Sequence, residues 1–92
     1  MKNELAVIHE LKMVASIFRD AGVHAHTNEM AGMVQTEIEC KGTHTEIFKV
    51  FINDDDTYHA VLVRDGKVIN EQTLESINRV RGALKFRIRK NQ

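Results

Sequence analysis

Apolar and polar residues alternate in four runs between Gly32 and Gln72, with a turn signal after each of the first three runs. Alternation with a period of two places successive side chains on opposite faces of a β-strand. Asp65–Gly66 is typical of a two-residue type I′ hairpin turn, and the other two turns are Gly42 to His44 and Asn53 to Asp56. The pattern predicts an antiparallel meander with strands over about residues 33–41, 45–53, 57–64 and 67–72.

A helix over about residues 3–21 is predicted ahead of the meander, because apolar residues recur there at helical spacing. Asn3 can accept a hydrogen bond as the N-cap, and Gly22 can adopt the left-handed conformation that ends a helix. Residues 23–31 follow neither period over a useful length, so we expect them to form a connection to the first strand, with room for a short extended piece at its start.

A second helix is predicted after the meander, over about residues 74–88, with Thr73 as its N-cap. Its apolar stripe ends in a segment, residues 85–90, that also alternates strictly between polar and apolar positions. A fifth strand is therefore the alternative to continued helix at this end of the chain.

The predicted turn lengths assign each strand residue to one of two sheet faces. The first face is the expected floor of the core and carries Val34, Ile38, Cys40, Phe48, Val50, Ile52, Val61, Val63 and Val68. The second face is more apolar on its middle strands than a solvated surface needs. Either the two helices divide between the faces, or another chain covers the second face. The expected interface residues are Ile47, Phe51, Tyr58, Leu62 and Ile69.

These elements predict an α+β fold: a helix, a four-stranded antiparallel meander and a helix, packed as a two-layer sandwich with at least the first helix on one sheet face. Ninety-two residues suffice for one domain with a modest core, so we expect residues 1–92 to form a single domain. Many unrelated proteins share this architecture, and the fold alone therefore indicates no function.

Composition indicates more about the location of the protein in the cell than about its activity. A lone cysteine, Cys40, cannot form an internal disulfide, and small secreted domains usually depend on disulfides, so we expect a cytoplasmic protein. No stretch approaches the roughly 18 apolar residues of a membrane-spanning helix. Thirteen Lys and Arg balance thirteen Asp and Glu, so the total charge predicts no particular partner.

The distribution of the charges is more informative than their total. Residues 79–92 hold six of the thirteen Lys and Arg and no acid. If they are helical, Phe86 lies among the cations, nearly opposite the apolar stripe that includes Leu84. An exposed aromatic ring among cations suits base stacking, an anionic surface or another protein. Alternatively, the cations favour the helix C-terminus and their stems shield its apolar edges. The candidate contacts are Arg79, Arg81, Lys85, Phe86, Arg87, Arg89 and Lys90.

Motifs for metal binding or catalysis are scarce. His24 and His26 have a ligand spacing in an extended segment, but no second pair at zinc-site spacing accompanies them. The run from Asp54 to Asp56 has His59 where a calcium-binding loop needs its glycine, so a solvated turn is the expected role. Cys40 is explained as a small core residue rather than a nucleophile. We predict no catalytic residue, metal or cofactor, with His24 and His26 as the nearest metal candidates.

The sequence thus favours a small non-enzymatic interaction or regulatory module that forms a homodimer, or binds another protein, through the second sheet face. A nucleic-acid-binding protein that uses the basic C-terminal segment is the alternative. A metal-dependent enzyme is a distant third hypothesis.

Overall fold

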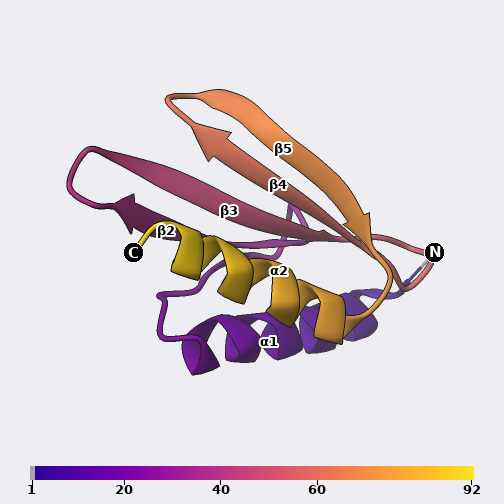
Figure 1. Cartoon of the computed structure of the whole chain (residues 1–92). Coiled ribbons are helices and arrows are strands. Elements are labelled where there is room, and N and C mark those ends of the chain that lie inside the picture. Colours follow the sequence, from indigo (N-terminus) through magenta and orange to yellow (C-terminus); the bar gives the residue numbers. More distant parts are fainter. Residues whose placement is uncertain (1) are drawn as a thin grey trace.

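The computed structural model describes residues 2–92 and shows an α+β protein (Figure 1). In chain order, one helix precedes an antiparallel sheet and a second helix follows it. The predicted fold class is confirmed, but the sheet has five strands rather than four. The elements are α1 (Glu4–Asp20), β1 (His26–Asn28), β2 (Met33–Cys40), β3 (His44–Ile52), β4 (Tyr58–Arg64), β5 (Lys67–Leu74) and α2 (Ile77–Lys90). The additional strand, β1, lies in the segment predicted as a connection, because three residues are too few to show a period.

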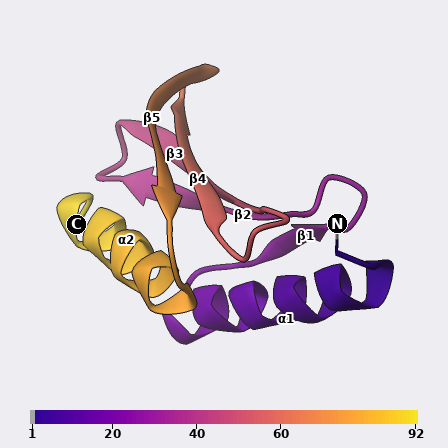
Figure 2. The same cartoon turned by 90° about the vertical axis from the view of Figure 1, so that its right-hand side faces the viewer.

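Both helices pack on the same face of the sheet, which makes the protein a two-layer sandwich (Figure 2). The strand order is β1-β2-β3-β4-β5. α1 packs on β1, β2 and β3, while α2 packs on β4, on β5 and against α1. We call the covered side the helix face, which includes Phe48 and Leu62, and the opposite side the outer face, which includes Lys49 and Val61. Within residues 2–92, no helix covers the outer face.

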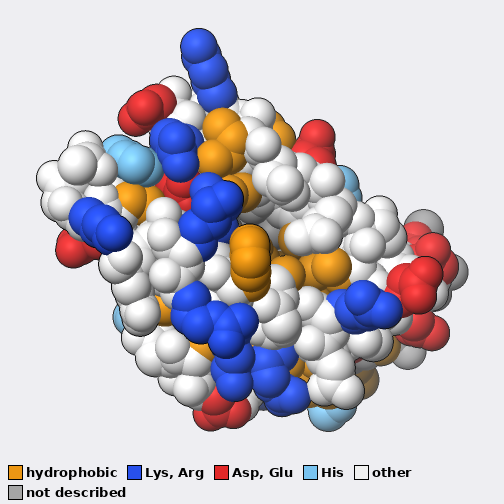
Figure 3. Space-filling view, viewed as in Figure 1, with side chains coloured by type: hydrophobic (Ala, Val, Ile, Leu, Met, Phe, Trp, Pro, Cys, Tyr) orange, Lys and Arg blue, Asp and Glu red, His pale blue; other side chains and the backbone are white. Residues whose placement is uncertain are grey.

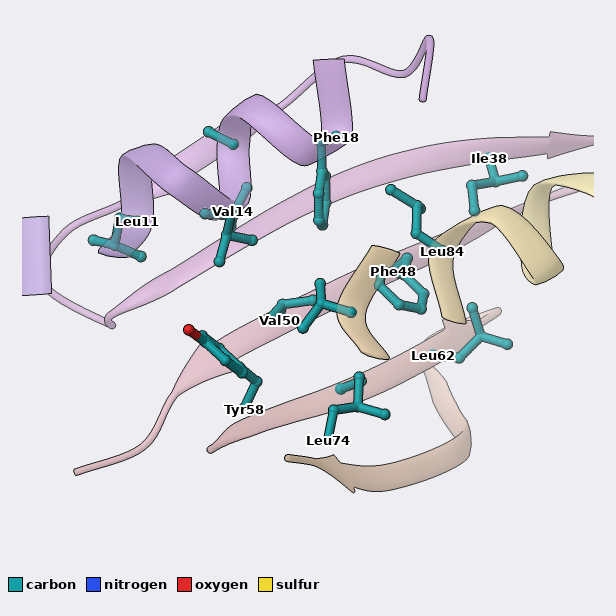
Figure 4. Close-up of a cluster of buried hydrophobic side chains, with 14 residues drawn as sticks. Leu11, Val14, Phe18, Ile38, Phe48, Val50, Tyr58, Leu62, Leu74 and Leu84 are labelled. Carbon is teal, nitrogen blue, oxygen red and sulfur yellow. The ribbon is translucent and has the colours of Figure 1, made fainter. Parts of the chain in front are cut away.

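A cluster of buried apolar side chains joins the two layers (Figure 4). Phe18 of α1 lies under the middle of the sheet, with its ring centroid 6.0 Å from that of Phe48 on β3. Val80 and Leu84 close the cluster from α2 and are fully buried. Because removal of apolar surface from water is the main term that favours folding, this cluster holds both helices on one face.

Both helices begin at capping residues. The side chain of Asn3 accepts a hydrogen bond from the Ala6 N–H at 2.8 Å, as the sequence predicts for α1. α2 begins later than predicted, because β5 continues to Leu74, and its cap is Ser76 instead of Thr73. α2 then continues to Lys90, so the alternative of a fifth strand over residues 85–90 is wrong.

The turn between β3 and β4 has five residues, 53–57, one more than predicted. The Asn53 N–H donates to the Thr57 carbonyl at 3.0 Å and closes the turn. Asp56 has a φ of 67°, in the left-handed region that Asp tolerates better than most residues. The Thr57 N–H in turn donates to the Asp55 carboxylate at 3.1 Å. These local hydrogen bonds keep Thr57 in the turn rather than in β4.

The longer turn exchanges the two faces of β4. Phe48 lies opposite Leu62 instead of Val61. Because side chains alternate along a strand, this shift by one residue reverses every assignment on β4. Tyr58 and Leu62, predicted for an interface, are buried in the core beneath the helices. Val61 and Val63, predicted for the core, lie on the outer face.

The β2–β3 pairing is shifted by two residues, which preserves the faces. Cys40 lies opposite His44 instead of Glu46. A shift by two keeps each side chain on its side of the sheet. Glu46 therefore points to the helix face, where it is fully buried.

A bulge interrupts the pairing of β4 with β5. Val63 lies opposite Val68 as predicted, but Leu62 lies opposite Asn70, so Ile69 is the additional residue. Val68 shares the outer face with Val63 and is not part of the core, contrary to the prediction. The start of β5, before the bulge, curls away from α2 together with the β4–β5 turn (Figure 2).

The register of β4 predicts unequal effects for two neighbouring substitutions. Leu62→Ala removes a buried side chain and should lower the free energy of unfolding by about 2–5 kcal/mol. Val63→Ala, on the half-buried outer face, should lower it by about 1 kcal/mol or less. Urea denaturation followed by circular dichroism measures both values. A larger loss for Val63→Ala than for Leu62→Ala would contradict this register.

Candidate functional site

A groove of about 350 Å³ lies between α2 and strands β4 and β5. Its floor is apolar and includes Phe48, Leu62 and Leu74. β5 exposes every residue before Leu74, because α2 covers the sheet only up to the edge of this strand. The groove is therefore an open part of the helix face, continuous with the core.

The rim of the groove is polar on the sheet side. Asn70 and Gln72 project from β5, and Asn78 projects from the first turn of α2. The bulge contributes to this arrangement, because it puts Asn70 opposite Leu62 on the helix face. Each amide offers donors and an acceptor, so the rim can hydrogen bond to a ligand of either polarity.

The α2 wall of the groove combines an aromatic ring with a gap. Phe86 remains 58% exposed and lies outside the core cluster, as its position opposite the apolar stripe predicts. Gly82 lies one turn earlier on the same wall, and a Cβ at this position would meet nothing within 4 Å. Its φ is not positive, so neither backbone conformation nor close packing requires a glycine. In a helix interior it costs about 1 kcal/mol relative to alanine.

Cations surround the groove on the α2 side. In Figure 3, Lys and Arg side chains gather over α2, with hydrophobic side chains showing between them. Of the six Lys and Arg on α2, only Arg87 makes a salt bridge within residues 2–92. Arg79 lines the groove, and Lys90 lies four residues after Phe86, on the same side of the helix.

Arg87 is held by the buried carboxylate of Glu46. Its Nε and Nη2 donate to the two carboxylate oxygens, each at 2.8 Å. The Arg64 guanidinium also donates to Glu46, with Nε at 3.1 Å, and Asn91 Nδ2 donates at 2.8 Å. These groups come from β3, β4 and the end of α2. Arg87, one of the predicted contacts, thus has an acidic partner inside the protein.

The hydrogen bonds from Arg87, assisted by those from Arg64 and Asn91, lower the pKa of Glu46 to about 2 despite its burial. The carboxylate is thus ionised at neutral pH. Sequence reasoning missed this cluster, although its signal was present: Glu46 shares the face of Phe48, and Arg87 lies three residues after Leu84. An acid and a base that both point inward from facing elements have to meet.

Cys40 and His44 lie beside Glu46, with one donor atom of each residue within 4.8 Å of the others. The donor set does not suit a divalent cation, because two guanidinium groups already occupy the carboxylate and would repel a further cation. Burial raises the pKa of the Cys40 thiol, which disfavours the thiolate that zinc binds. His24 and His26, the predicted metal candidates, are exposed elsewhere, with ring centroids 4.4 Å apart.

The residues predicted for a dimer interface are not brought together. Tyr58 and Leu62 are in the core, while Ile47 and Phe51 remain half-buried on the outer face. Ile69 is exposed at the bulge of β5. Three of the five predicted interface residues therefore remain outside the core. Of the seven predicted contacts on α2, six remain outside the Glu46 cluster.

No protein-family model, curated protein or solved structure matches the chain. In the described part of the chain, residues 2–92, no helix is long and apolar enough to cross a membrane.

The Glu46 cluster predicts a stability that depends on pH. The pKa of Glu46 is lower in the folded state, about 2, than its ordinary value of 4.5, so the ionised form stabilises the fold above about pH 5. This contribution, about 3 kcal/mol by linkage, should disappear as the pH falls towards 2. Glu46→Gln should therefore be less stable than the wild type by about that amount at pH 7, with the difference shrinking below pH 5.

Thermal or urea unfolding between pH 7 and pH 2 measures this effect. Glu37→Gln is the matched control, because Glu37 is an exposed glutamate on β2. A constant difference between the wild type and Glu46→Gln across this range would show that the ion pairs do not account for the stability.

Proposed function

We propose that this protein is a small non-enzymatic module that binds nucleic acid through the basic surface of α2. The observation that supports this function is the charge of α2, which has six cations and no acid. Among these six cations, only Arg87 has an acidic partner within residues 2–92. Cations that contact phosphates release condensed counterions, and this release supplies most of the non-specific affinity for nucleic acid. Since the protein is neutral overall, the attraction is local to α2.

The packing of α2 favours nucleic acid over a membrane surface. An interfacial helix inserts a continuous apolar face into the lipid. The apolar stripe of α2, with Val80 and Leu84, is instead fully buried against the sheet. Phe86 is the only large hydrophobic side chain that α2 exposes among the residues that the structure describes. A single ring among cations suits base stacking better than membrane insertion.

Loss of two cations from α2 should weaken nucleic-acid binding and its salt dependence together. For Lys85→Gln/Lys90→Gln, the slope of log affinity against log salt for a single-stranded oligonucleotide should become shallower by about 1.4, at about 0.7 per contact. Fluorescence anisotropy with a labelled oligonucleotide over a series of salt concentrations measures this slope.

Lys12→Gln/Lys41→Gln is the matched control, because it removes the same charge from exposed positions on α1 and beside β2. The control should keep the wild-type slope. Equal losses in the two variants would mean that total charge, rather than α2, determines binding. A wild-type protein that binds no oligonucleotide at low salt would refute the proposed function.

A homodimer through the outer face is the second candidate function. The half-buried side chains of Ile47, Phe51 and Val63 form an apolar strip on β3 and β4, and within residues 2–92 nothing covers it. Lys49 and the His59–Glu71 ion pair, with a distance of 2.9 Å between Nε2 and Oε1, interrupt the strip. These charges and the burial of Tyr58 and Leu62 make this surface less favourable for association than the sequence suggests.

Light scattering distinguishes this second candidate. If the outer face forms a dimer, the wild type should have twice the monomer mass at micromolar concentration. Phe51→Glu should be a folded monomer, because association would bury the introduced charge in the interface without a partner. A monomeric wild type would remove the dimer.

A further inference from the structure

The groove beside α2 has the two kinds of surface that a nucleobase needs. A base has apolar faces, which stack on aromatic rings, and a polar edge, which hydrogen bonds. Phe86 offers an exposed ring at the groove wall, and Leu62 lies on the floor. Asn70, Gln72 and Asn78 supply amide groups at the rim. Amides of this kind pair with base edges that present one donor and one acceptor.

The volume of the groove suits a small ligand. At about 350 Å³, it lies near the lower end of the range of about 300–1,000 Å³ for small-molecule sites. Gly82 contributes to this space, because any other residue would project its side chain from the same wall that carries Phe86. Gly82 thus destabilises α2, and the feature that it keeps open is the groove.

Cations flank the aromatic ring along α2. Arg79 lies seven residues before Phe86, and Lys90 lies four residues after it, so both share its side of the helix. A strand whose base enters the groove places its phosphates on either side of that base. Arg79 and Lys90 put positive charge on both sides of Phe86 along the helix, which favours an occupant with phosphates on both sides of its base.

A paired base cannot enter the groove without leaving its duplex. Unpairing and unstacking cost a few kcal/mol per base, and a single strand avoids this cost. We propose that the groove between α2 and β5 receives an unpaired base stacked on Phe86, so that the module prefers single-stranded nucleic acid over duplex. This inference rests on the proposed function of α2, and it adds the form of nucleic acid that is bound.

The test compares a short labelled single strand with a duplex of the same sequence, in anisotropy titrations at one low salt concentration. The wild type should bind the single strand at least about tenfold more tightly. Phe86→Leu keeps an apolar side chain but removes the aromatic face, so it should weaken single-strand binding by about tenfold to a hundredfold and leave duplex binding unchanged. Phe86→Tyr should restore the preference.

Gly82 provides an independent test of the groove. Gly82→Gln fills the groove and should reduce single-strand binding without changing duplex binding. Gly82→Ala is its control: it should bind the single strand nearly as well as the wild type and should melt at a higher temperature, because alanine favours the helix. Circular dichroism and melting curves establish that all of these variants fold.

The outcomes separate the two proposals. Equal affinity for single strand and duplex, with no effect of Phe86→Leu, would overturn the base-binding groove while the basic surface of α2 keeps its function. Absence of binding to either form would overturn both. Binding of a labelled polyglutamate peptide with the same dependence on Phe86 would overturn the groove as a nucleobase site and identify an acidic peptide as its occupant.

Discussion

The position of α2, and with it the shape of the groove, depends on the buried carboxylate of Glu46. Two guanidinium groups and one amide converge on it from β4 and from the end of α2. An ionised carboxylate is tolerated in an interior only where it is paired and hydrogen bonded. α2 therefore cannot slide along the sheet without leaving this charge unpaired. The apolar contacts of Val80 and Leu84 are not directional and would allow α2 to shift along the sheet. The ion pairs to Glu46 are directional, so they select one placement of the helix.

The same cluster divides the basic segment into two roles. Arg87 lies next to the inward side of α2, where it balances an internal acid at the end of the groove, whereas Phe86 exposes its ring at the groove wall. Neighbouring residues of a helix point about 100° apart, so the cations of this segment do not all face the same side. Charge counting treats the segment as uniform. Helical geometry makes Arg87 a structural residue and leaves its neighbours available to a ligand.

The periodicity of apolar residues was sufficient to predict both helices and the meander. It failed on β4, where two strand registers fit the apolar pattern about equally well. β4 is apolar on both faces, with Tyr58 and Leu62 on one and Val61 on the other, and His59 is the one polar residue that the predicted register would turn towards the core. The choice then fell to the turn after Ile52, whose residues suit four positions as well as five. The groove could not be predicted at all, because it depends on the bulge at Ile69 and on the distance between α2 and β5.

The last strand of the sheet bears on what can occupy the groove. β5 has backbone groups along an exposed edge, which in many proteins pair with a second chain. Here the bulge at Ile69 breaks the regular spacing of that edge. A second copy that extended the sheet across β5 would also place two α2 helices, each with six cations and no acid, on the same side of the joined sheet. Geometry and charge thus both disfavour self-association at this edge, and they leave the groove open to a ligand with negative charge.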